Sequence, residues 1–138
     1  MPVIELDMLI AFVNAADHNH TSAVRLFESI TRNKSTRHQV ATSAYLEYEL
    51  VHRSRGMKES EIFTEISSFQ ALPHLGETGL PARTILRGLL LRQDYKLTYF
   101  DSLHAASAVL SDGRIISTDR AYDDVEGLER LEPSEFSP

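Results

Sequence analysis

Cysteine is absent from this chain of 138 residues. Disulfides and thiolate metal sites are therefore excluded, so any metal ion must be held by oxygen or by imidazole nitrogen. No apolar run approaches the roughly 20 residues that a membrane-spanning helix needs. The N-terminus, MPVIELDML, lacks the positive region, long apolar run and cleavage site of a secretory signal. We therefore expect a cytoplasmic protein.

Motifs of several common enzyme classes are also missing. The sequence contains no glycine-rich phosphate loop, no GxSxG elbow and no dinucleotide-binding fingerprint. The net charge of −6 is unusual for a protein that binds phosphate backbones. This objection weakens if the acidic side chains gather in one cleft that a divalent cation fills, because the cation reverses the local field.

Length and composition indicate one globular domain that spans residues 1–138. Short apolar runs at residues 3–6, 40–42 and 114–118 predict strands, and a further edge strand is expected near the C-terminus. Between them lie helical patterns, at residues 9–15, 20–30, 43–55, 58–69, 82–91 and from 101 onward. The prolines and glycines of residues 73–81 predict a loop. Strands separated by helices predict an α/β fold with a short-stranded, mainly parallel central sheet covered on both faces.

Four acidic residues stand at the ends of short apolar runs: Asp7, Glu49, Asp101 and Asp119. In an alternating strand–helix protein, ligand sites form at the carboxyl ends of the strands. Carboxylates brought together there repel one another by about 3 kcal/mol per pair at about 5 Å and an effective dielectric of about 20. A divalent cation removes that repulsion, and hard oxygen ligands favour Mg²⁺ or Mn²⁺.

Each of these acids also has a structural interpretation. Asp7 and Asp101 are suited to capping a helix, Asp119 to a turn, and Glu49 to a solvated helix surface. Glu47 competes with Glu49, because two residues on a helix are about 200° apart and only one can face a cleft. Leu46 and Leu50 predict the core face of this helix, and neither glutamate shares that face fully. The residues alone leave the choice open.

Four segments, LDMLIAF, SAYLEYEL, YFDSLHAASA and IISTDRAYDDVEGL, resemble PIN-domain nucleases, and more narrowly the ribonuclease toxins of VapBC toxin–antitoxin pairs. The resemblance runs in order from Val3 to Leu131 and implies a three-layer α/β/α PIN-like domain. It also implies an RNA substrate, an antitoxin partner and a homodimer. The residues that it implies as catalytic and metal-binding are Asp7, Glu49, Asp101 and Asp119, with Glu49 favoured over Glu47.

Three further residues are candidates for a supporting role at this site. The hydroxyl of Thr118 is suited to binding a carboxylate or a metal-bound water. His104 lies three residues after Asp101, where it would hydrogen-bond that carboxylate, contact RNA, or be a buried and satisfied imidazole. Asp123 is a candidate substitute for an acid that the family often has at the position of Ala121, and Asp124 is the alternative to it.

The sequence departs from the family pattern at two places. Met8 stands where a hydroxyl is common, and Ala121 stands where a further acid is common, which puts a second metal ion in doubt. The expected function is that of a Mg²⁺- or Mn²⁺-dependent endoribonuclease that acts as the toxin of a toxin–antitoxin pair. Two alternatives remain open: a catalytically impaired PIN-like module that binds RNA or protein, and a metal-dependent phosphatase of small phosphate esters.

Overall fold

The fold is built on a five-stranded sheet in the order β3-β2-β1-β4-β5, and each of its four strand pairings is parallel. A computed structural model describes residues 1–35 and 37–136. The parallel α/β architecture predicted from the sequence is confirmed. The strands are β1 (Val3–Ile4), β2 (His38–Ala41), β3 (Leu75–Thr78), β4 (Arg114–Ile116) and β5 (Glu129–Leu131).

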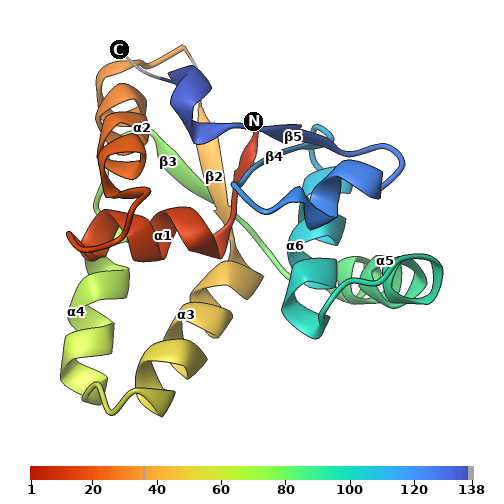
Figure 1. Ribbon diagram of the computed structural model, residues 1–138, viewed down its shortest axis with the longest axis horizontal. Coiled ribbons are helices and arrows are strands. Elements are labelled where there is room, and N and C mark those ends of the chain that lie inside the picture. Colours follow the sequence, from red (N-terminus) through yellow and green to blue (C-terminus); the bar gives the residue numbers. More distant parts are fainter. Residues whose placement is uncertain (36, 137–138) are drawn as a thin grey trace.

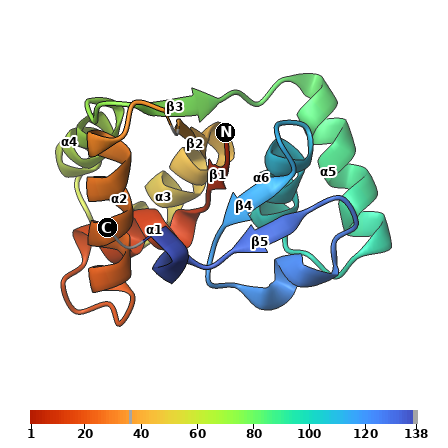
Figure 2. The ribbon, with the colours of Figure 1, turned by 90° about the horizontal axis from the view of Figure 1, so that it is seen from above.

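Helices lie on both sides of the sheet. Figures 1 and 2 show α1 and α2 on one side of the strands, with α5 and α6 on the other. Helices α3 and α4 form a hairpin that projects from the body (Figure 1). No helix in the described part of the chain is long and apolar enough to cross a membrane. The helices are α1 (Leu6–Val13), α2 (His20–Arg32), α3 (Thr42–Ser54), α4 (Glu59–Gln70), α5 (Ala82–Asp94) and α6 (Tyr99–Val109), with the 3₁₀ helices η1 (Arg120–Asp124) and η2 (Pro133–Phe136).

The central strands are short, and both of their faces are buried. Val3, Ile4, Ile115 and Ile116 have no solvent exposure, and neither does Val40 on the neighbouring strand. Strands buried on both faces appear in a sequence as continuous β-branched runs rather than as alternating ones. The apolar runs of β1 and β4 end at Ile4 and Ile116, and the residues that follow them meet at the same end of the parallel sheet.

One strand was not predicted. Residues Leu75–Thr78 form β3, whereas the sequence predicted a loop over this proline- and glycine-punctuated segment. β3 lies at the edge of the sheet and pairs only with β2. An edge strand tolerates a residue such as Gly76, because one of its sides makes no ladder hydrogen bonds.

The predicted core face of α3 is wrong. Leu46 and Leu50 are 43% and 51% exposed, whereas Ala44, Tyr45 and Tyr48 are buried. The helix carries large apolar side chains on both sides, so its periodicity did not reveal which side packs against the body. The buried side is the one that packs against α1 and α6, and this orientation decides which glutamate faces the sheet end.

Candidate metal centre

Four side chains converge at the carboxyl end of β1. Glu5, Glu47, Asp101 and His104 each offer one ligand atom, and these atoms all lie within 4.8 Å of one another. Glu5 follows β1 and is the N-cap of α1, Glu47 lies on α3, and the other two lie on α6. The group therefore forms where the first strand ends and two helices from distant parts of the chain meet, which is the usual place for a ligand site in a parallel sheet.

Glu5 is buried in this group, with only 5% exposure. Its Oε2 accepts a hydrogen bond from Ser117 Oγ at 3.0 Å. Burial raises the pKa of the Glu5 carboxyl well above its ordinary value, and the negative charges of Asp7 and Asp101 raise it further. A nearby cation would oppose all of these effects on the charged form.

His104 has no solvent exposure and uses both ring nitrogens. Its Nε2 lies 2.7 Å from Glu47 Oε1 and 3.8 Å from Glu5 Oε1. Its Nδ1 lies 2.7 Å from Ser43 Oγ. Of the three interpretations of His104, the structure shows a buried and hydrogen-bonded imidazole, whose partners are Ser43 and Glu47. Ser43 lies in the first turn of α3 after the N-cap Ala41, and its hydroxyl contacts the imidazole.

Asp101 lies in the first turn of α6 but is not its cap. Thr98 is the N-cap, and its hydroxyl accepts the hydrogen bond from the Asp101 backbone N–H at 3.2 Å. Tyr122 donates its hydroxyl to Asp101 Oδ1 at 3.2 Å. Burial raises the pKa of the Asp101 carboxyl, and the charges of Asp119 and Glu47 add to that shift. The Asp101 carboxylate therefore lies in the cluster, and the N-cap role belongs to Thr98.

Asp7 lies beside the four-residue group and joins α1 to the segment after β4. Its Oδ2 accepts hydrogen bonds from the Thr118 backbone N–H at 2.8 Å, from Thr118 Oγ1 at 2.7 Å and from Ser117 Oγ at 3.2 Å. Its Oδ1 is buried and has no hydrogen-bond partner among the described residues. A buried carboxylate oxygen without a donor is an observation that itself fits a nearby cation.

Asp119 and Asp123 follow β4 at the same end of the sheet. Asp119 Oδ1 accepts a hydrogen bond from the Ala121 backbone N–H at 2.9 Å and so caps η1. The negative charge of Asp119 also contributes to the raised pKa of the Asp101 carboxyl. Asp123 is instead held by Arg130, with Nε 2.7 Å from Asp123 Oδ1. The structure therefore does not bring Asp123 into the group, and its carboxylate does not substitute there for the acid missing at Ala121.

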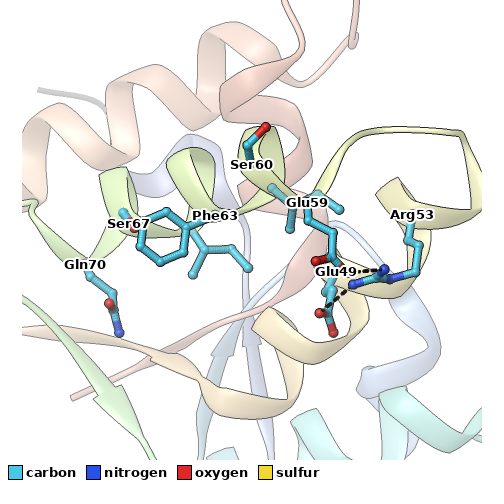
Figure 3. Close-up of a pocket in the computed structure, with 9 residues that line it drawn as sticks. Glu49, Arg53, Glu59, Ser60, Phe63, Ser67 and Gln70 are labelled. Carbon is cyan, nitrogen blue, oxygen red and sulfur yellow. Dashed lines mark hydrogen bonds and ion pairs between the residues drawn. The ribbon is translucent and has the colours of Figure 1, made fainter.

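Glu49 faces away from the group. Its side chain is 42% exposed and pairs with Arg53 at 3.1 Å, while Arg53 also binds Glu59 at 2.7 Å. Figure 3 shows these three residues at one end of a groove between α3 and α4, which Phe63 also lines. Glu47, about 200° around the helix, is the glutamate that the structure places with Glu5 and Asp101.

Sequence reasoning missed Glu5 and ranked Glu47 below Glu49. Glu5 was included in the first strand, although β1 ends at Ile4 and Glu5 is the first residue after it. The signal for Glu47 is its spacing of four from Ser43, which puts both on the helix side that meets His104. That spacing carries information only once the buried side of α3 is known.

The backbone carbonyl of Ser117, directly after β4, is held by the Arg130 side chain on β5. Arg130 donates from Nη1 to Ser117 O at 3.1 Å and to Glu132 Oε1 at 2.5 Å. Its side chain is only 9% exposed. Because Ser117 and Thr118 both bind Asp7, Arg130 holds the segment that orients the carboxylates without touching the cluster itself.

The donor set of this centre fits a divalent cation. Three carboxylates supply hard oxygen ligands, and the imidazole supplies a nitrogen. Met8, whose missing hydroxyl was noted in the sequence, is fully buried in the core. The hydroxyls that bind Asp7 come from Ser117 and Thr118.

The PIN-domain family model matches residues 7–128 of the chain. None of the curated proteins matches the sequence significantly. The fold is similar to that in a crystal structure of VapBC2 from Rickettsia felis bound to a promoter DNA fragment, with 12% identity, a TM-score of 0.73 and coverage of 94% of this chain and 96% of that chain.

Two further solved structures share the fold. A toxin–antitoxin complex from Klebsiella pneumoniae has 16% identity, a TM-score of 0.65 and coverage of 96% of this chain and 98% of that chain. VapC20 from Mycobacterium tuberculosis, a toxin that cleaves the sarcin–ricin loop, has 15% identity, a TM-score of 0.66 and coverage of 87% of this chain and 91% of that chain.

Proposed function

Because the chain belongs to the PIN-domain family, we propose that it is a metal-dependent endoribonuclease that hydrolyses phosphodiester bonds in RNA. One domain, residues 1–138, carries the activity. Its substrate is single-stranded or loop RNA, and it works in the cytoplasm, where such RNA is exposed. The similarity of its fold to VapC20, a toxin that cleaves an RNA loop, supports this proposal.

The convergence of Glu5, Glu47 and Asp101 is the observation that carries the proposal. These three carboxylates hold Mg²⁺ or Mn²⁺. Such a cation lowers the pKa of bound water and stabilises negative charge on the leaving oxygen of a phosphodiester. The burial of Glu5 excludes bulk water from one side of the site, which strengthens every electrostatic interaction there.

The other predicted acids have roles around this cluster. Asp7 orients Ser117 and Thr118, and through the Ser117 hydroxyl it also fixes Glu5. Asp119 adds a further carboxylate at the rim, where its charge acts on Asp101. Glu49 has no role in catalysis, because Arg53, which also binds Glu59, pairs with it on the far side of α3.

The matched pair Glu47→Gln and Glu49→Gln tests the assignment on a single helix. Glu47→Gln and Asp101→Asn should each lower the cleavage of a labelled RNA by at least about 100-fold, because each removes part of the several kcal/mol that a metal supplies. Glu49→Gln should cleave like the wild type, and circular dichroism should confirm that all three variants fold. Normal cleavage by Glu47→Gln, or its loss in Glu49→Gln, contradicts the assignment.

We further propose that this nuclease is the toxin of a type II pair, and that it forms a homodimer and binds an antitoxin protein. The structures of VapBC2 and of the Klebsiella pneumoniae complex, which have a similar fold, support the antitoxin partner. Large apolar side chains are exposed on α3, α4 and α5, which suits burial by other chains: Leu46, Leu50, Phe63, Leu86, Leu89 and Leu90. Induced expression should arrest growth, and co-expression of a small DNA-binding protein encoded beside the gene should relieve the arrest.

The alternative of an impaired module is weakened at Met8, because the hydroxyls of Ser117 and Thr118 bind Asp7 although Met8 has none. Ala121 remains, since Asp123 does not replace the missing acid. A melting experiment separates these alternatives: a working site gains stability with added Mg²⁺ or Mn²⁺ by mass action, and a dead one does not. A phosphatase would hydrolyse a generic phosphate ester and leave the labelled RNA intact.

A further inference from the structure

We propose that His104 is a nitrogen ligand of the bound cation and makes the centre selective for a first-row transition ion such as Mn²⁺ over Mg²⁺. This inference rests on the cation site of the proposed function and adds the identity of the ion to it. The juxtaposition that carries it is one imidazole nitrogen among three carboxylates, all with ligand atoms within 4.8 Å.

The place of His104 in the fold is that of a ligand rather than of a core residue. Its neighbours Leu103 and Ala105 are buried, and Ala105 belongs to the apolar core, whereas the His104 Nε2 lies 2.7 Å from Glu47 and 3.8 Å from Glu5. The ring stacks against Phe100 at a centroid distance of 6.2 Å. Phe100 and the two carboxylates therefore fix the plane of the imidazole and the direction of Nε2.

Ser43 allows Nε2 to exchange its hydrogen for a cation. Without a cation, Nε2–H donates to the Glu47 carboxylate, and Nδ1 accepts from the Ser43 hydroxyl at 2.7 Å. With a cation, the Nε2 lone pair faces the ion, and Nδ1–H donates to the same Ser43 oxygen. A hydroxyl serves both arrangements because it donates and accepts. An imidazole held from its second nitrogen in this way is the usual arrangement of a metal-binding histidine.

The mixed donor set then decides between cations. Mg²⁺ prefers oxygen ligands in near-ideal octahedral geometry and retains several of its waters. Imidazole nitrogen binds first-row transition ions, among which Mn²⁺ also accepts carboxylate oxygen readily. A site with three carboxylates and one imidazole should therefore bind Mn²⁺ more tightly than Mg²⁺. This difference in affinity should shrink when the imidazole nitrogen of His104 is removed.

Pulsed electron paramagnetic resonance of Mn²⁺ bound to the full-length protein tests this directly, because it detects coupling to a coordinated nitrogen. Wild-type protein should show this coupling, and ¹⁵N-histidine labelling should change it. His104→Gln should keep a hydrogen bond to Glu47 and still bind Mn²⁺, but without the coupling. Its preference for Mn²⁺ over Mg²⁺, measured by calorimetry, should fall by about tenfold or more. His52→Gln is the matched control, since His52 is also buried but contacts Tyr48 instead of the cluster.

The outcomes separate this inference from the proposal on which it rests. Mn²⁺ bound to wild-type protein without nitrogen coupling overturns the role of His104 and leaves the carboxylate site intact. The wild-type spectrum alone decides this, even if His104→Gln fails to fold. If neither Mn²⁺ nor Mg²⁺ binds, the proposed function fails and the inference fails with it.

Discussion

At the scale of single residues, Glu5 shows how the site opposes the stability of the fold. Its carboxyl is buried, and it lies beside the charges of Asp7 and Asp101. These surroundings raise its pKa, so the folded state binds the Glu5 proton more tightly than the unfolded state does. Between the ordinary pKa and the raised one, the folded state holds more protons, and the free energy of unfolding falls as the pH rises.

Replacing Glu5 by glutamine should therefore stabilise the metal-free protein at neutral pH. Glu5→Gln should melt at a higher temperature than the wild type in the presence of a chelator, and the melting temperature should fall less steeply above pH 5. The same variant should lose the stabilisation that Mn²⁺ gives the wild type. Calorimetry across pH with and without Mn²⁺ measures both effects, and a destabilised variant that still responds to Mn²⁺ would contradict this account of Glu5.

The residue scale is also where sequence reasoning was least complete. Asp101 was identified because it stands at the end of a short apolar run, and this feature is visible in the sequence. Glu5 was missed because the end of a two-residue strand is not marked by composition. Glu47 was ranked second because the buried side of α3 is set by its packing on α1 and α6, which periodicity within one helix does not contain.

At the scale of elements, the end of β4 is held in place by β5. Arg130 on β5 binds the Ser117 carbonyl and the carboxylates of Asp123 and Glu132. In the same segment, the side-chain hydroxyls of Ser117 and Thr118 bind Asp7 at the start of α1. The sequence predicted β4 and an edge strand after it. It could not predict that the Arg130 side chain connects them, because this contact depends on how the two strands pair.

Arg130→Met keeps the apolar stem of the side chain and removes its donors. The Ser117 carbonyl loses a charged partner, so the free energy of unfolding should fall by about 1–3 kcal/mol. The affinity for Mn²⁺ should fall by about tenfold, because residues that orient ligands change metal affinity by about 10–100-fold. Chemical denaturation and calorimetry are the measurements.

Arg53→Met is the control for this variant. Arg53 also binds two carboxylates, Glu49 and Glu59, but on the surface and away from the cluster. It should leave Mn²⁺ binding unchanged, because exposed ion pairs contribute little. Equal effects of the two variants on Mn²⁺ affinity would show that Arg130 does not orient the site.

At the scale of the whole molecule, an acidic protein must bind a polyanion. The chain carries a net charge of −6, and its cluster adds negative charge where the RNA phosphate would lie. The overall field therefore opposes RNA until a cation neutralises the site. The family resemblance pointed to the fold and the substrate class, whereas composition alone argued against nucleic acid.

RNA binding should consequently depend on the divalent cation even when cleavage is prevented. A labelled RNA analogue that cannot be cleaved should bind more weakly to the wild-type protein with a chelator than with Mn²⁺. The expected difference is about tenfold or more, which corresponds to about 1.4 kcal/mol of attraction. Fluorescence anisotropy at fixed ionic strength measures the affinity, and equal affinities in the two conditions would place the RNA elsewhere on the surface.

Anomalous diffraction from a crystal soaked in Mn²⁺ tests the central claim most directly. The account predicts a peak about 2.0–2.6 Å from oxygens of Glu5, Glu47 and Asp101, and no peak at Glu49. A peak beside Glu49 and Glu59, or no ordered ion among the three carboxylates, would contradict the claim that these side chains form a metal centre.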